Sequence, residues 1–298
     1  MPRERRPPAE RVRERLARVA GTARAGRMPA GYQRLGRVLV VRLPDDLRPF
    51  FPVIGAAWQE ALGVATVLVR TGPISGEFRR PRTETIAGGP TETEVVEHGV
   101  RWRFDAAEVM FAAGNRTERR RAASVVRPGE VVVDMFAGIG YFAIPAARTG
   151  RPARVVAIEK NRVAARYLRE NAVLNGVADR LEVVEGDNRR VGPAVGAADR
   201  IFLGYLPSAV PWVPRAVELL RDDGGWLHVH TVTDARGALD AAVAAVSTEL
   251  RASGRRAVEA RAREVKPYGP GRAHVVVDAR VGPVDRRSAV QDSAGTGI

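Results

Sequence analysis

The sequence predicts an α/β protein in which a doubly wound domain with a parallel sheet follows a smaller α+β domain. Residues 121–283 alternate between short β-branched runs and helical stretches, which is typical of successive βα units. Residues 131–145 place a buried strand directly before a glycine turn and an apolar helix. Before residue 120, two strands, one helix and an alternating hairpin indicate a separate α+β module.

This pattern divides the chain into four expected segments. They are a basic flexible arm at 1–30, an α+β domain that binds substrate or RNA at 31–120, the doubly wound domain at 121–283, and a disordered tail at 284–298. Within the arm, a short helix over 10–20 is an alternative to disorder. The α+β domain is predicted to contain strands at 37–42 and 64–70, a helix at 47–62 and a hairpin at 92–104.

The second domain is expected to contain a regular series of elements. After the first strand come strands at 153–159, 181–187, 199–207 and 226–232, a helix at 161–175, and a loop with a closing strand over 265–278.

Composition excludes several kinds of site. The chain has 298 residues and no cysteine, which rules out disulfides and thiolate metal sites. His228 and His230 alternate on an apolar strand, where we expect packing and no metal ligation. No apolar run reaches the roughly 20 residues that a membrane span needs, and the charged N-terminus lacks the apolar segment of a signal peptide. We therefore expect a cytoplasmic monomer without metal or membrane contact.

The charge balance favours a polyanionic partner. The formal net charge is +14, nearly all from arginine, since Lys160 and Lys266 are the two lysines of the chain. Arginine binds phosphate in a bidentate manner, so nucleic acid is the expected partner. A compositional bias toward arginine is the alternative explanation of the same excess.

Acidic residues end three successive strands of the second domain. Asp134 precedes the turn that contains Gly138 and Gly140, Glu159 lies about 20 residues beyond that turn, and Asp187 ends the third strand. Carboxylates at the carboxyl edge of an open sheet suit a ligand with hydroxyls, an amino group and a cation. A pyrophosphate site would need a further glycine where the chain has Ala143 and Ile144. An ordinary β-to-α turn is the alternative reading.

This edge resembles that of the class I S-adenosylmethionine-dependent transferases, which have a Rossmann-like fold. Residues 36–281 as a whole resemble the tRNA position-37 enzymes, which include a guanine-N1 methyltransferase and the wybutosine-synthesising aminocarboxypropyltransferase. The matching segments are Phe78–Arg82, Ile86–Gly88, Val96–Asp105, Val109–Arg120, Asp134–Phe142, Gly186–Asn188 and Leu203–Ser208.

Two segments distinguish the branches of this family. The methyltransferase branch has Phe-Ser-Pro-Arg, with its arginine at the position of Gly114, and Asn-Leu-Pro at the position of Tyr205 to Pro207. The aminocarboxypropyl branch has Met-Phe-Ser-Ser-Gly-Asn and Leu-Gly followed by two hydrophobic residues and Pro-Ser. Residues 110–115 and 203–208 match the second branch, with Ala112 and Ala113 in place of the two serines.

The resemblance implies S-adenosylmethionine as cofactor and tRNA as partner, and it assigns roles to particular positions. Glu159 would hold the ribose hydroxyls, Asp187 and Asn188 would flank the adenine, and Asn115 and Tyr205 would face the substrate base as catalytic residues. Arg119 would brace the cofactor or an RNA phosphate, with a solvated helix charge as the alternative. The full cofactor-binding set is Ala112, Arg119, Asp134, Phe136, Ala137, Gly138, Gly140, Glu159, Asp187, Asn188 and Leu203.

The implied reaction is transfer of the 3-amino-3-carboxypropyl group to a wyosine-type guanosine at position 37 of tRNA, with methylthioadenosine released. A sulfonium has three carbons open to displacement, and the one held in line with the nucleophile reacts. Without the branch-specific arginine, the methionine arm can offer its γ-carbon in place of the methyl group. Guanine-N1 methylation, the same transfer to another acceptor, and RNA binding without catalysis stay open as alternatives.

Overall fold

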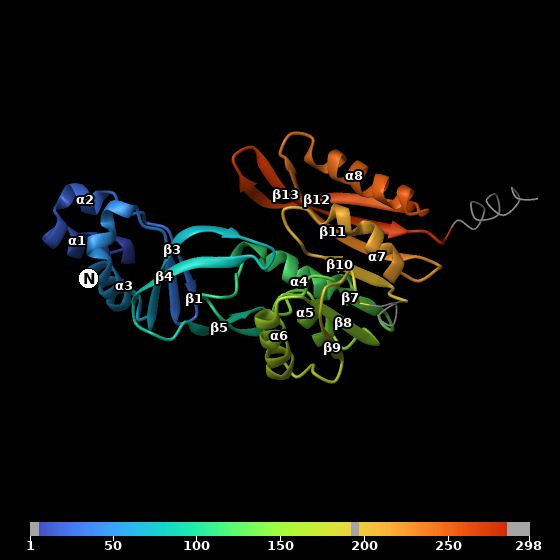
Figure 1. Cartoon of the computed structure of the whole chain (residues 1–298), viewed down its shortest axis with the longest axis horizontal. Coiled ribbons are helices and arrows are strands. Elements are labelled where there is room, and N and C mark those ends of the chain that lie inside the picture. The colour runs from blue at the N-terminus through green and yellow to red at the C-terminus, as the bar shows by residue number, and fades with distance from the viewer. Residues whose placement is uncertain (1–5, 192–196, 285–298) are drawn as a thin grey trace, which may run out of the picture. The chain divides into compact units, whose positions relative to one another are not determined.

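The computed structural model describes residues 6–191 and 197–284, and the chain divides into two compact units (Figure 1). The first unit comprises Met1–Ala113 and the second comprises Gly114–Ile298. The part of the expected tail at 285–298 lies outside the described residues, as do residues 1–5.

The first unit is built on a four-stranded sheet in the order β1-β2-β3-β4. The central pair, β2 and β3, is parallel, and both outer pairings are antiparallel. A separate antiparallel hairpin, β5–β6, follows at the predicted position. The bounds are β1 Tyr32–Leu35, β2 Val38–Val41, η1 Asp45–Phe50, α3 Phe51–Leu62, β3 Thr66–Ser75, β4 Arg80–Ala87, β5 Glu92–Glu97 and β6 Val100–Asp105.

The expectation of a flexible arm is wrong for residues 8–28. Helices α1 (Pro8–Ala20) and α2 (Thr22–Gly26) are part of the first unit, and Val12, Leu16 and Met28 are buried in one cluster with Trp58 of α3. The apolar residues of α1 are spaced at helical intervals and form one buried stripe. Because arginines surround that stripe in the sequence, composition alone suggested a solvated segment.

The second unit contains a seven-stranded sheet in the order β12-β13-β11-β10-β7-β8-β9. The strands β11, β10, β7, β8 and β9 pair in parallel, which confirms the α/β fold class. The strand bounds are β7 Val131–Asp134, β8 Arg154–Glu159, β9 Leu181–Glu185, β10 Arg200–Leu203, β11 Gly225–Asp234, β12 Ala257–Gly269 and β13 Arg272–Val281.

The closing part of this sheet differs from the prediction. Residues 257–269 form a strand of their own, and β13 lies antiparallel between β11 and β12. The expected loop is reduced to the short turn between β12 and β13. Pro267, Gly269, Pro270 and Gly271 are typical of a loop, but in the structure β12 continues through Pro267 to Gly269 before the chain turns.

Helices cover both faces of the second sheet. The core on one face joins α7 (Val213–Leu219) and α8 (Ala238–Ala252) to inward residues such as Val133, Leu203 and Val229. Alternate residues point the other way, where Phe202 and His230 contact Phe142 just before α5 (Ala143–Arg148). The remaining helices of the described part are η2 Ala113–Asn115, α4 Arg116–Val125, α6 Arg162–Leu174 and η4 Val210–Trp212. Among the described residues, no helix is both long enough and apolar enough to cross a membrane.

Candidate functional site

The candidate site begins at the carboxyl end of β7, where Asp134 is fully buried. Its Oδ1 accepts a hydrogen bond from the Phe136 backbone N–H at 3.3 Å, and its buried Oδ2 has no hydrogen-bond partner. Burial raises the pKa of Asp134 to about 7, against the opposing effect of nearby backbone N–H groups. A carboxyl group with a near-neutral pKa and an unused acceptor atom therefore lies at this end of the sheet.

Glu159 connects the end of β8 to the glycine turn. Its Oε2 accepts from the Gly138 N–H at 2.7 Å, and its Oε1 accepts from the Asn161 N–H at 2.7 Å. Burial raises the pKa of this carboxyl, and the backbone hydrogen bonds from Asn161, Gly138 and Lys160 act in the opposite direction. A carboxylate has about four acceptor positions, so three backbone hydrogen bonds leave about one of them for a ligand hydroxyl.

The glycine turn itself requires its two glycines. Gly138 and Gly140 have φ values of +57° and +102°, which side chains with a Cβ rarely adopt. A Cβ on Gly140 would also collide with the Ile144 side chain. Because Gly138 and Gly140 have no side chains, a ligand can approach the backbone of the turn closely.

The third edge position lies just beyond β9, which ends at Glu185, two residues earlier than predicted. Asp187 binds Arg189 and, at 2.9 Å, the Lys160 ammonium, and these contacts, the Arg189 hydrogen bond first, hold its pKa well below the usual range. Asn188 is buried, donates from Nδ2 to the Met135 carbonyl at 3.0 Å, and leaves its buried Oδ1 without a partner. The Asn188 side chain therefore links the loop after β9 to the turn after β7 by a hydrogen bond. Its Oδ1 atom remains able to accept a hydrogen bond from a ligand.

Aromatic residues complete the edge at β10. The rings of Phe136 and Tyr205 lie 5.1 Å apart between centroids, and Phe136 also contacts Trp212 edge-on at 5.3 Å. Leu203 and Ala137 are completely buried, backbone included, so the structure leaves no atom of either exposed to a ligand. The structure thus brings Tyr205 together with Phe136, as a shared site would require.

A second group of residues lies at the start of α4. Arg119 is 2 % exposed, which excludes a solvated helix charge, and its guanidinium lies 5.7 Å from the centroid of the Tyr141 ring in the glycine turn. Asn115 has a buried Oδ1 without a partner. Lys266, from β12, lies close to Gly114. Ala112 belongs to the first unit.

Lys266 was missed as a site candidate. The signal was present in the sequence, since lysine occurs twice in a chain that otherwise uses arginine for positive charge. Lys266 lies close to Gly114 because β12 pairs with β13, and the sequence did not predict that pairing.

The histidines of the sheet form a buried polar core. His228 contacts Asp278 at 2.6 Å and Arg200 at 2.7 Å, and His230 contacts His274 at 2.9 Å. Burial lowers the pKa of His228 and of His274 to about 4. These residues are packed and hydrogen-bonded. Over residues 6–191 and 197–284, no group of three or more His, Asp or Glu side chains is placed to hold a metal ion.

Comparison with known proteins identifies relatives over nearly the whole chain. Residues 93–256 match the model of the TRM5/TYW2 methyltransferase domain, and residues 12–91 match that of the TYW2 N-terminal domain. The tRNA(Phe) (4-demethylwyosine(37)-C(7)) aminocarboxypropyltransferase of Pyrococcus horikoshii is 36% identical over 271 residues, which are 91% of this chain and 96% of that protein.

Two solved structures extend this likeness. P. horikoshii TYW2 in complex with MeSAdo matches with a TM-score of 0.80 and 33% identity, covering 92% of this chain and 99% of that one. Methanocaldococcus jannaschii TYW2 in complex with AdoMet matches with a TM-score of 0.69 and 31% identity, covering 85% and 100%. The resemblance noted from the sequence is confirmed, and the chain belongs to the TRM5/TYW2 family.

Proposed function

We propose that this protein transfers the 3-amino-3-carboxypropyl group of S-adenosylmethionine to a wyosine-type guanosine at position 37 of tRNA and releases methylthioadenosine. The observation that carries the proposal is the match to the TYW2 N-terminal domain beside a relative named for this transfer that is similar over almost its full length. The proposed substrate, a tRNA, would place the enzyme in the cytoplasm.

The candidate site fits S-adenosylmethionine by the atoms it leaves unsatisfied. Glu159 would accept from a ribose hydroxyl at its remaining acceptor position. The unpartnered Oδ1 of Asn188 would accept from the adenine amino group, flanked by Asp187. The bare backbone from Phe136 to Gly140 would lie under the cofactor, with the buried Asp134 carboxyl beneath it. When bound, the sulfonium supplies an electrophile that is already activated.

What this chain contributes to the reaction is orientation. The γ-carbon must be held in line with the acceptor atom so that the new carbon–carbon bond forms as the carbon–sulfur bond breaks. The sulfur keeps the bonding electron pair in methylthioadenosine, and the acceptor carbon loses its proton. Gly114 has no side chain with which to hold the methionine carboxylate in the manner of the methyltransferase branch. Tyr205, beside Phe136, and Asn115 would face the acceptor base.

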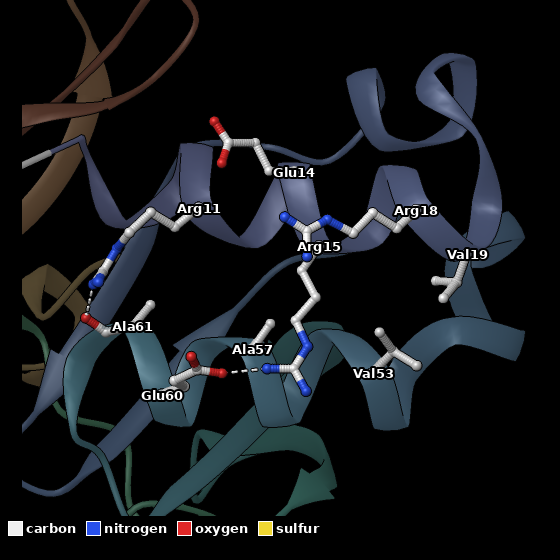
Figure 2. A pocket seen from close by; sticks show the side chains of 9 residues that line it. All are labelled: Arg11, Glu14, Arg15, Arg18, Val19, Val53, Ala57, Glu60 and Ala61. Carbon is white, nitrogen blue, oxygen red and sulfur yellow. Dashed lines mark hydrogen bonds and ion pairs between the residues drawn. The ribbon is translucent and has the colours of Figure 1, made fainter.

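A groove on the first unit is suited to tRNA phosphates. It measures about 550 Å³, lies between α1 and α3, and is lined by three arginines and two glutamates among other residues (Figure 2). Arg11 binds the Ala61 carbonyl and Arg15 binds Glu60. The exposed Arg18 forms no ion pair with a carboxylate of the described residues, so it is available for a phosphate.

The proposed transfer can be tested with two separately labelled cofactors. Enzyme and tRNA that carries the wyosine-type precursor are incubated with S-adenosylmethionine labelled in the carboxyl group or in the methyl group. We expect the carboxyl label in the RNA and the methyl label in methylthioadenosine. The same tRNA with an unmodified guanosine at position 37 serves as control and should take up neither label.

Each alternative gives a different distribution of label. Methyl label in the RNA, with S-adenosylhomocysteine as product, would make guanine-N1 methylation the better assignment. Methylthioadenosine formed with other acceptors but never with tRNA would point to a different substrate. If the protein formed no product and did not bind the cofactor, RNA binding without catalysis would be the remaining alternative.

A further inference from the structure

Lys266 occupies the space that a side chain at position 114 would need. A Cβ atom added to Gly114 would lie 2.9 Å from the Lys266 Nζ and 3.2 Å from its Cδ. The φ of Gly114 is outside the left-handed region, so its backbone does not itself require glycine. The absence of a side chain at this position therefore makes room for the lysine.

The surroundings of Lys266 are rich in positive charge and poor in negative charge. The side chain is half-buried on β12, and burial together with the nearby Arg119 lowers its pKa. Its ammonium has no carboxylate partner among the residues that the structure describes. Its cross-strand neighbour is His274, whose pKa is lowered by burial and by the charge of Lys266. Two neighbouring cations and a neutral imidazole favour the binding of an anion.

This cationic pair is connected to the glycine turn through one ring. The Arg119 guanidinium lies over Tyr141, and the Tyr141 ring lies where a Cβ on Gly138 would come within 2.9 Å of it. Gly138 in turn is hydrogen-bonded to Glu159. The Tyr141 ring therefore lies between Arg119 and the backbone of the glycine turn, which is proposed to lie under S-adenosylmethionine.

We propose that Lys266 binds the carboxylate of the methionine arm and acts as a positioning residue for aminocarboxypropyl transfer. The proposal rests on the proposed function. It places the cation on β12, whereas the methyltransferase branch carries its arginine at the position of Gly114, before α4. A carboxylate held from a different element presents a different carbon of the sulfonium to the acceptor. An ammonium on a flexible stem also acts as a point charge, without the fixed fork of arginine.

The test compares two ligands that differ only in the carboxylate. Dissociation constants of S-adenosylmethionine and of decarboxylated S-adenosylmethionine are measured by isothermal titration for the wild type and for Lys266→Met. Loss of a charge-assisted hydrogen bond should weaken S-adenosylmethionine about tenfold or more. Decarboxylated S-adenosylmethionine should stay within about twofold of its wild-type value because it lacks the group that Lys266 binds.

Two further variants separate charge from structure. Lys266→Arg keeps a cation at the site and should restore part of the affinity for S-adenosylmethionine. Arg261→Met removes an exposed cation from the same strand and should change neither dissociation constant. Thermal unfolding of each variant establishes that the second unit remains folded.

Three results have distinct meanings. Equal weakening of both ligands by Lys266→Met would overturn the proposal, because the lysine would then act on a shared part of the pocket. Unchanged affinity of Lys266→Met for S-adenosylmethionine would also overturn it, and weaker tRNA binding of the same variant, measured by fluorescence anisotropy, would then assign Lys266 to a phosphate. A wild-type protein that binds neither ligand would contradict the proposed function itself.

Discussion

Asp134 shows how one buried side chain can connect stability to a binding site. Its pKa of about 7 lies well above the ordinary value of 3.8, mainly because of burial. Between these two pH values the folded protein holds a proton that the unfolded chain has released. The free energy of unfolding attributable to this group is therefore greatest below pH 4, falls as the pH rises toward 7, and is constant above that.

Asp134→Asn should remove this dependence. An amide keeps the size of the carboxyl and cannot ionise, so the wild type should lose stability relative to the variant as the pH rises from about 4 to 7. Urea unfolding of both proteins without ligand, at several pH values in this range, measures the difference. The buried histidines titrate in both proteins and cancel. Parallel curves would show that Asp134 ionises at its ordinary pKa in the folded state.

At the scale of elements, α1 is a structural part of the first unit. Leu16 is completely buried against the cluster that contains Trp58, whereas Val19 on the same helix is 57% exposed. Arg11 and Arg15 of α1 reach Ala61 and Glu60 of α3, and Arg18 lines the same groove (Figure 2). Deleting residues 1–30 would therefore remove part of the core along with the basic charges.

Leu16→Ala should destabilise the first unit by about 2–5 kcal/mol, because it leaves a cavity in a packed cluster. The matched change Val19→Ala should alter stability by no more than about 0.5 kcal/mol, since surface substitutions rarely do more. Chemical unfolding followed by circular dichroism measures both. Equal, small effects would mean that α1 is not docked in solution.

For the whole molecule, the net charge of +14 bears on tRNA binding. Binding that neutralises phosphates releases counterions, so the affinity should fall steeply as salt rises. Arg18→Gln should weaken tRNA binding and reduce the slope of log K against log salt by about one, since one phosphate contact is lost. Fluorescence anisotropy of labelled tRNA at several KCl concentrations gives this slope.

A control with the same change of net charge is available in the second unit. Arg180 directly precedes β9, at the opposite end of that strand from Asp187, and pairs with Asp179. Arg180→Gln should leave the slope unchanged. Identical slopes for the wild type, Arg18→Gln and Arg180→Gln would exclude the groove on α1 and α3 as a phosphate contact.

The sequence by itself determined the strand–turn–helix unit around Asp134 and the positions of Glu159 and Asp187. These features depend on neighbouring residues: β-branched runs make strands, and Gly138 and Gly140 permit a turn that other residues resist. The hairpin β5–β6 followed from strict alternation in the same way. A matching order of motifs along the chain was also enough to indicate the family.

Only the tertiary structure decided which distant residues meet. In the structure α1 packs on α3, and β13 lies antiparallel between β11 and β12. Asn188 donates a hydrogen bond to the Met135 carbonyl, and Lys266 lies beside Gly114. None of these contacts has a local signature, because each depends on the order of strands in a sheet or on which apolar stripe finds a partner. Periodicity specifies the face that a segment buries, and packing specifies what that face is buried against.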